Sequence, residues 1–351
     1  MAISGTITLK TGDIIEITDS NILASSLKLT MSTCQGLTYD LGSFNAGMLN
    51  VGIFDDEALD HEFDGAKIEL SAVEEKEEEA VTTSLGIYLV DGSKTQRKKN
   101  VVKLTAQDYS TLFDIELSAE IKEGTYSPYA LAARLCSDVG VRLLNEDFTD
   151  FPNNLIRFSP SSVSVQTARD AIMWIAQLIC CNAIIDRQGQ LVFRPARYLE
   201  SDGDIVVDYE SDGSDRVSTQ FSDVRTYIKY LSAYVGNAPK EYVSDINPSD
   251  AQAREAGLTL PKNPLLETLS EDEQNTINEA TLEYLDNFAP RAIKAVMFFN
   301  PSIKLGDTIR FSGGRIDVRR SIIGVVTYIS PAYNGLMTVY CAAPQAVKAV
   351  A

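Results

Sequence analysis

The feature that most constrains the fold is a series of strand and turn signals near the C-terminus. Residues 308–311 and 322–329 are rich in β-branched and aromatic side chains, which are typical of strands. Gly306 and Asp307 form a turn signal before the first of these strands. Asn334 and Gly335 form a strong hairpin signal before residues 336–341. The segment contains no catalytic motif, so it indicates a structural wall rather than an active site.

Residues 1–115 repeat this pattern of short strands separated by turn residues. Gly12 and Asp13 precede a strand just as Gly306 and Asp307 do, which is compatible with a repeated barrel. Strands at regular spacing with turns between them are typical of a sandwich or a barrel. The expected strands cover residues 6–9, 14–17, 22–30, 48–53, 67–72, 85–90 and 100–106.

Helical periodicity appears between residues 116 and 214, which we expect to form a small α/β domain. Ser127 and Pro128 mark the start of a first helix, and Gly140 marks its end. A second helix is expected over residues 164–181, followed by a hairpin of residues 182–186 and 191–194. The buried stripe of this second helix consists of Ala168, Ile172, Ile175 and Ile179. Trp174 lies beside the stripe and is expected to pack in the core.

Strand patterns return at residues 215–236 and again at residues 288–351, which we assign together to a second barrel. Residues 237–287 between them are polar and contain four prolines. Ser270 and Glu273 form a capping-box pattern at the start of an expected helix over residues 271–286. We therefore expect a mainly β fold with α+β insertions, and a polar, partly helical insert that departs from the second barrel.

Charge and hydropathy exclude several classes of protein. The 351 residues include 31 Lys and Arg against 49 Asp and Glu, a formal net charge of −18. This balance argues against a protein that binds nucleic acid phosphates or an anionic membrane. It suits a soluble surface, or a channel through which a polyanion passes without binding. No apolar run approaches the roughly 20 residues that span a bilayer, and the N-terminus has no signal-peptide pattern.

Cysteine and histidine usage further narrows the chemistry. The five cysteines form no Cys-x-x-Cys pair, and Cys180 and Cys181 lie in an apolar run, so buried thiols are expected. His61 is the only histidine and is expected to be a solvated loop residue, which nearly excludes histidine triads and multi-histidine zinc sites. The other cysteines are Cys34, Cys136 and Cys341.

Clusters of acidic residues do not make a convincing metal site either. Glu74 to Glu79 form a run broken only by Lys76, which we interpret as a solvated hairpin tip. The Asp-Gly turns at residues 201–205 and 211–215 leave a weak calcium site open, although solvated turns are the preferred interpretation. Phosphate-loop, dinucleotide-binding and nucleophile-elbow motifs are absent. We predict no catalytic, cofactor-binding or metal-binding residues.

The order of several segments along the chain carries a resemblance, although each segment alone is unspecific. They are Tyr39-Asp-Leu-Gly-Ser-Phe-Asn-Ala46, Leu49-Asn-Val51, Phe63-Asp-Gly-Ala-Lys-Ile68, Leu85-Gly-Ile-Tyr-Leu-Val-Asp91, Val101-Val-Lys-Leu-Thr-Ala-Gln-Asp-Tyr109, Phe113-Asp114, Thr125-Tyr-Ser-Pro-Tyr-Ala-Leu-Ala132 and Asn300-Pro-Ser-Ile-Lys-Leu-Gly-Asp-Thr-Ile309. In this order the chain resembles, over almost its whole length, the tail-hub proteins of phages and prophages of Gram-positive bacteria.

The resemblance implies the fold of contractile-phage baseplate hubs: two tail-tube-like barrels per chain, smaller decorating domains and a homotrimer. It implies a hub joining the hexameric tail tube, or a distal tail protein ring, to the spike or tip. The tape measure protein is another implied partner, and DNA is expected to pass through the lumen without specific binding. The chain is then located in a virion or phage-tail-like particle. Many relatives continue into a peptidase or lysozyme-like region, whereas this chain stops at Ala351, so we expect no enzymatic activity.

Two other functions remain open at the level of sequence. One is a cell-wall hydrolase that uses carboxylates, since a chain with 49 acidic residues always offers candidate pairs. The other is a carbohydrate-binding component of the tail tip. A zymogram tests the first alternative and a glycan-binding assay tests the second.

Overall fold

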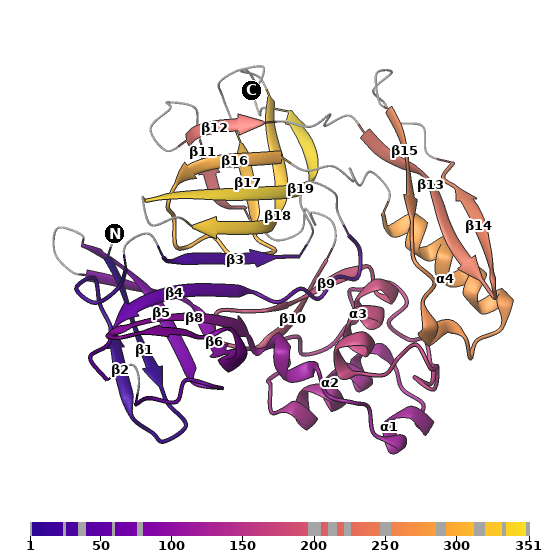
Figure 1. Ribbon diagram of the computed structural model, residues 1–351. Coiled ribbons are helices and arrows are strands. Elements are labelled where there is room, and N and C mark those ends of the chain that lie inside the picture. Colours follow the sequence, from indigo (N-terminus) through magenta and orange to yellow (C-terminus); the bar gives the residue numbers. More distant parts are fainter. Residues whose placement is uncertain are drawn as a thin grey trace.

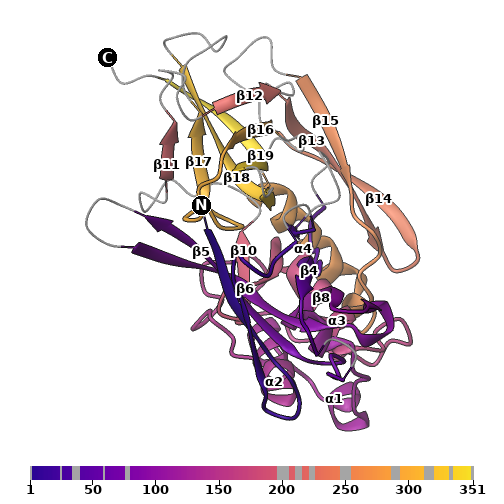
Figure 2. The ribbon, with the colours of Figure 1, turned by 60° about the vertical axis from the view of Figure 1, so that its left-hand side comes forward.

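The structure is a computed structural model of the chain. It describes residues 2–23, 26–33, 40–57, 60–75, 80–195, 205–209, 216–220, 226–245, 254–285, 293–311, 320–331 and 335–348. Figures 1 and 2 show two β-rich halves, a helical module beside the first half, and a small sheet with one helix at the edge.

The first half is an antiparallel sheet with the strand order β3-β4-β8-β6-β5-β1-β2, and β7 pairs with β8. Side chains alternate between faces because a strand has a period of two residues. In β8, for example, Val102, Leu104 and Ala106 are buried. The strands are β1 (Ala2–Thr8), β2 (Ile14–Ile17), β3 (Lys28–Ser32), β4 (Met48–Phe54), β5 (Lys67–Glu75), β6 (Ala80–Val90), β7 (Gln96–Lys98) and β8 (Val101–Asp108).

The second half contains the C-terminal strands together with two earlier ones. Its order is β12-β16-β19-β18, β17 pairs with β18, and β11 pairs with β17 in parallel. Met297, Ile309 and Val339 lie in its core. The strands are β11 (Ile205–Tyr209), β12 (Arg216–Gln220), β16 (Ile293–Phe298), β17 (Thr308–Phe311), β18 (Arg320–Pro331) and β19 (Leu336–Lys348).

A short antiparallel pairing between β3 and β18 joins the two halves into one sheet, visible at the centre of Figure 1. Met31 lies opposite Ile329, and the backbone N–H of Thr33 extends the pairing by donating to the carbonyl of Thr327 at 2.8 Å. Met31 and Phe299 pack against the hydrophobic cores of both halves. The described strands therefore form a 14-stranded sheet with two cores.

The expectation of a mainly β chain is confirmed, whereas that of two closed barrels is not. The main strand path ends at β2 and β12, and no pairing among the described strands connects these ends. The sequence pattern predicts strands and their buried faces, but barrel closure depends on pairing between distant strands, which local periodicity does not determine. Among the described strands, β2 does not pair with β3 and β11 does not pair with β12, so neither half closes on itself.

The helical module contains α1 (Ala119–Glu123), α2 (Pro128–Val139) and α3 (Ala168–Leu178), followed by the hairpin of β9 (Cys181–Ile185) and β10 (Leu191–Pro195). Ser127 caps α2, and Gly140 ends it in the left-handed conformation, as predicted. The expected second helix over residues 164–181 is too long. Thr167 and Asp170 form a capping box that starts α3, and Cys180 has a φ of 55°, which the helix does not accommodate.

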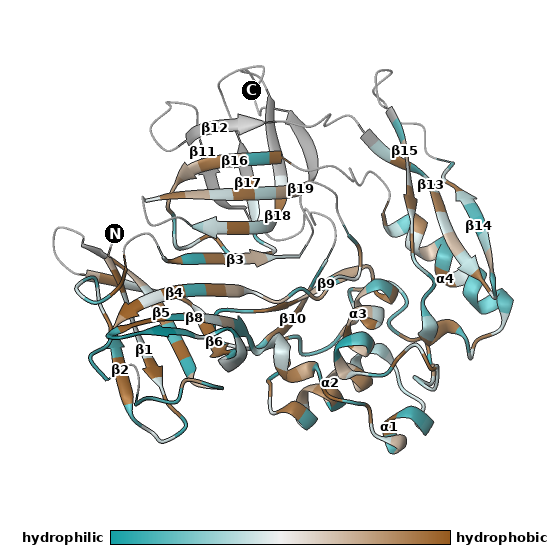
Figure 3. Cartoon of the chain, in the orientation of Figure 1, coloured by the Kyte–Doolittle hydropathy of each residue, from teal (hydrophilic) through white to brown (hydrophobic). Residues whose placement is uncertain are grey.

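The insert forms a three-stranded sheet with the order β14-β13-β15, and α4 packs on it. Here the structure corrects the sequence analysis, because residues 226–235 were expected in the second barrel. Ile228 and Leu231 instead share a core with Leu282 of α4. The surface of α4 is largely hydrophilic (Figure 3). The elements are β13 (Thr226–Val235), β14 (Ala238–Val243), β15 (Arg254–Thr259) and α4 (Glu271–Tyr284), and the predicted Ser270–Glu273 capping box is present.

The two Gly-Asp turns adopt the conformation that glycine favours. Gly12 has a φ of 95° and Gly306 a φ of 81°, in the left-handed region that side chains with a Cβ rarely enter. Strands β2 and β17 begin two residues after these glycines. The turn signals in the sequence are therefore correct at both positions.

Candidate functional site

The described residues offer little for catalysis or metal binding. None of them forms a group of three or more His, Cys, Asp or Glu side chains arranged to hold a metal ion. Among the same residues, no helix combines the length and hydrophobicity needed to cross a bilayer. Both Asp-Gly turns considered for calcium, residues 201–204 and 211–215, lie outside the described residues, as does Cys34.

His61 lies in the loop between β4 and β5, as predicted, but it is packed rather than solvated. Its side chain is 19% exposed. Nδ1 lies 2.9 Å from Oδ2 of Asp55 and Nε2 lies 3.4 Å from Oε2 of Glu57, while the ring meets Phe63 edge-on. No described hydroxyl or thiol group hydrogen-bonds to the ring. The arrangement holds a loop in place and lacks the nucleophile of a catalytic triad.

The acidic run belongs to a hairpin, in agreement with its interpretation as a tip. Strands β5 and β6 pair antiparallel as far as Glu75 opposite Ala80. Residues 76–79, at the tip itself, lie outside the described residues.

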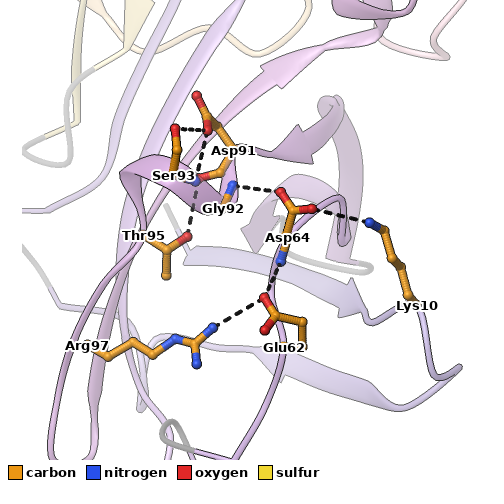
Figure 4. A network of polar contacts seen from close by, with 8 residues as sticks. All are labelled: Lys10, Glu62, Asp64, Asp91, Gly92, Ser93, Thr95 and Arg97. Carbon is orange, nitrogen blue, oxygen red and sulfur yellow. Dashed lines mark hydrogen bonds and ion pairs between the residues drawn. The ribbon is translucent and has the colours of Figure 1, made fainter.

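A network of polar contacts at the edge of the first half has a structural role (Figure 4). Asp64 accepts a hydrogen bond from the backbone N–H of Gly92 at 3.0 Å and pairs with Lys10 at 3.3 Å. Glu62 pairs with Arg97 at 3.5 Å, and Asp91 accepts hydrogen bonds from Ser93. These groups are mostly exposed, so each ion pair contributes about 0–1 kcal/mol. The network joins three loops of the sheet edge.

The cysteines that the structure describes are buried, as predicted. Cys136, Cys180, Cys181 and Cys341 are each 2% exposed or less. Burial raises the pKa of Cys136 to about 12 and raises that of Cys181 well above its ordinary value, aided by the nearby Cys180. These thiols are therefore protonated and poor nucleophiles at neutral pH. Trp174 packs against the core of the helical module, also as predicted.

Sequence reasoning missed a buried carboxylate where the first half meets the helical module. Asp108, at the end of β8, accepts hydrogen bonds from the backbone N–H groups of Gly47 at 2.7 Å and Ser110 at 3.0 Å. Burial raises the pKa of Asp108 to about 6, against the opposing effect of these hydrogen bonds. Arg169 of α3 donates to the carbonyls of Phe44 and Ser110 and stacks over the Phe44 ring. This cluster fixes the module against the sheet.

A second missed residue, Arg187, connects the β9–β10 turn to both halves. Arg187 is 6% exposed, and the two terminal nitrogens of its guanidinium group donate to the carbonyls of Pro301 and Ile303. The Arg187 carbonyl in turn accepts a hydrogen bond from Ser84 of β6. Burial lowers the pKa of this guanidinium from its usual value. An arginine in a short polar turn carries no sequence signal for this role.

These groups of residues share a structural role, because each connects parts of the fold. The β3–β18 pairing, the Asp108–Arg169 cluster and the Arg187 contacts each join parts of the chain that are distant in sequence. The arrangement holds two sheet halves and a helical module in a fixed relation.

Comparison with known proteins identifies the fold. No family model matches the chain, and no curated protein sequence matches it. Among solved structures, it is similar to the 43 kDa tail protein of prophage MuSo2 from Shewanella oneidensis, with a TM-score of 0.56 and 11% identity over 97% of this chain and 98% of that one. A tail protein from Neisseria meningitidis MC58 gives a TM-score of 0.56, with 9% identity and 97% coverage of both chains.

A prophage tail protein, gp18, from Listeria monocytogenes EGD-e has a TM-score of 0.52 and 9% identity, over 97% of this chain and 94% of that one. The likeness extends from end to end in all three cases. The fold of this chain is therefore that of phage tail proteins. The three similar structures come from different bacteria, and the expected restriction to Gram-positive hosts is not confirmed.

Proposed function

We propose that the protein is a structural component of a phage tail or phage-tail-like particle, where it acts as the hub at the distal end. The observation that carries this proposal is the end-to-end fold similarity to tail proteins. The connections between the halves support it, because a load-transmitting hub needs parts held in a fixed relation. In this role the chain is not an enzyme and needs no cofactor or metal.

In the proposed assembly, three copies surround the tail axis and each contributes its two sheet halves as tube-like wall units. Six near-equivalent units then match a hexameric tail tube, or a distal tail protein ring, on one side and a three-fold spike or tip on the other. We propose that the walls correspond to residues 1–115 and to β11 and β12 with residues 288–351. The expected boundary of the α/β domain at residue 214 is wrong, because β11 pairs with β17 of the second half, so residues 116–195 form that domain. The insert, starting at residue 226, lies outside the ring.

The charge of the chain suits this position. A net charge of −18 gives the assembled walls a negative potential, which repels phosphates and lets DNA slide through the lumen without specific binding. The tape measure protein is a further partner in this proposal, since it occupies the same lumen before DNA does. The chain itself needs no membrane insertion.

Immunogold electron microscopy tests the location. Particles purified from the source bacterium are labelled with antibodies raised against this chain. We expect gold at the distal end of the tail, at the junction of the tube and the tip. Label on the head, along the whole tail or only on free protein contradicts the proposal.

A peptidoglycan zymogram tests the alternative of a cell-wall hydrolase. We expect no clearing, because a pocket beside the β9–β10 hairpin and one beside α4 are each lined by a single carboxylate, Asp186 and Glu267, whereas glycoside hydrolysis uses a pair. Clearing that a single carboxylate substitution abolishes overturns the structural role as the sole activity. Binding to cell-wall glycans on an array favours the carbohydrate-binding alternative instead.

A further inference from the structure

A pocket of about 410 Å³ lies where the β9–β10 hairpin, the segment after α2 and the turn before β17 meet. Its lining includes Met31 of the strand that joins the two halves. None of the predicted functions uses this pocket. A second pocket, beside α4, has a volume of about 270 Å³.

The charge of the lining is opposite to that of the whole chain. Four basic side chains contribute to it, Arg142, Arg187, Arg194 and Lys304, against one carboxylate, Asp186. The Asp186 carboxylate already accepts hydrogen bonds from the backbone N–H groups of Gln188 and Gln190. In a chain with a net charge of −18, a concentration of cations around one cavity is a local feature that favours an anion.

These four cations form no ion pair with a carboxylate in the part of the chain that the structure describes. The Nε atoms of Arg187 and Arg194 are buried and have no hydrogen-bond partner. Asp307 lies close enough to both arginines for their charge to lower its pKa, in opposition to the larger effect of burial. Its carboxylate accepts a hydrogen bond from the backbone N–H of Lys304 at 2.7 Å. The two buried guanidinium groups therefore add positive charge next to the pocket, and this charge favours an anionic group within it.

The remaining lining is aliphatic. Ile184, Val192 and Leu305 contribute apolar surface next to the cations, and Leu144 at the same site is 38% exposed. A free inorganic anion makes no apolar contact with these aliphatic side chains. A peptide with a carboxylate side chain beside an aliphatic one uses both parts of the pocket.

We propose that this pocket docks a segment of a partner protein in which Glu or Asp adjoins an aliphatic residue. Arg142 and Lys304, both exposed, pair with the carboxylate, and the buried guanidinium groups of Arg187 and Arg194 add to the positive potential around it. The aliphatic residue packs on Ile184 and Val192. Nucleic acid is disfavoured because the negative charge of the rest of the chain repels a long polyanion. The proposal goes beyond the hub role and does not depend on it.

Isothermal titration calorimetry with the full chain tests this docking site. The probe is an end-blocked hexapeptide of alternating Leu and Glu, and its matched control replaces each Glu by Gln. We expect the Glu peptide to bind at least tenfold more tightly and to lose affinity as salt is added, because charge attraction is screened. Equal affinity for the two peptides, or binding of neither at millimolar concentration, overturns the proposal.

Single substitutions inside and outside the pocket lining show where the Glu peptide binds. Arg142→Gln and Lys304→Gln change exposed side chains. Each should lower the affinity for the Glu peptide at least threefold without altering the circular dichroism spectrum. Arg157→Gln, an equally exposed arginine outside the lining, should leave binding unchanged. If Arg157→Gln weakens binding as much as Arg142→Gln, the attraction is a general surface effect and the proposal fails. It also fails if inorganic phosphate binds at the pocket while the Glu peptide gains nothing over the Gln peptide.

Discussion

Asp108 shows how a single residue can make stability depend on pH. Its carboxylate is buried between β8 and the helical module, and desolvation raises its pKa from 3.8 to about 6. The folded chain therefore holds this proton more strongly than the unfolded chain does. The stabilisation that this proton brings is complete below the unfolded pKa near 4, and it is lost as the pH rises through 6.

Replacing Asp108 by Asn removes this pH dependence. We expect the free energy of unfolding of the variant, relative to wild type, to rise by about 2 kcal/mol between pH 4 and pH 7, since the wild type must ionise a buried group over that range. Urea unfolding of dilute protein, followed by the fluorescence of Trp174, the only tryptophan, measures it. A difference between variant and wild type that stays constant with pH contradicts the assignment.

Asp91→Asn is the matched control, because the pKa of Asp91 moves the other way. Hydrogen bonds from the Ser93 hydroxyl and the Lys94 side chain lower it. Asp91 therefore adds stability above its unfolded pKa, and this is lost as the pH falls. The relative stability of this variant should decline from pH 4 to pH 7, opposite in sign to Asp108→Asn.

At the scale of elements, the β3–β18 pairing controls how the two halves are joined. Thr33→Pro removes the backbone N–H that donates to the Thr327 carbonyl, and proline cannot replace this ladder hydrogen bond. We expect amide hydrogen exchange to accelerate at residues 327–331 and 29–32, with α2 and α3 unaffected. Thr33→Ser, which keeps the N–H and the hydroxyl, should preserve protection. Unchanged exchange in the proline variant would contradict the contribution assigned to this pairing.

Helix α3 carries the core of the helical module. Ile179, which directly follows it, is fully buried, so Ile179→Asp places an unpaired charge in that core and should cost on the order of 3–5 kcal/mol. Leu155→Asp introduces the same charge in the same module at a side chain that is 85% exposed, and should change stability by less than about 0.5 kcal/mol. Thermal melts compare the two. Similar melting temperatures would exclude the packing described for Ile179.

Local signals in the sequence predicted the elements well. Ser127 and Gly140 mark the ends of α2, Ser270 and Glu273 start α4, and the glycine turns precede strands where expected. Each of these features depends on residues within a few positions of one another. Caps and turns have strong side-chain requirements, so the sequence is sufficient to place them.

The partners of the strands were less predictable. Strand β13 has the alternation of a half-buried strand, but nothing in its residues specifies β14 and β15 over β16. Likewise, the pairing of Met31 with Ile329 and the contacts of Arg187 with Pro301 and Ile303 join residues more than a hundred positions apart. A period of two residues fixes which face is buried, not which strand lies alongside.

At the scale of the whole molecule, the described sheet is open, with ends at β2 and β12. Open edges expose unpaired backbone groups, which proteins cover or pair with other chains. In the proposed hub, neighbouring copies adjoin around the tail axis, so the open halves become parts of a closed wall. The account thus requires assembly for function.

Native mass spectrometry at raised protein concentration, with the tail-tube protein of the same particle supplied, measures whether three copies assemble. The proposed hub should give a species of three times 38.5 kDa that persists as the concentration is varied, with tube subunits added in multiples of six. A chain that stays monomeric under these conditions, or that forms assemblies unrelated to three-fold symmetry, contradicts it.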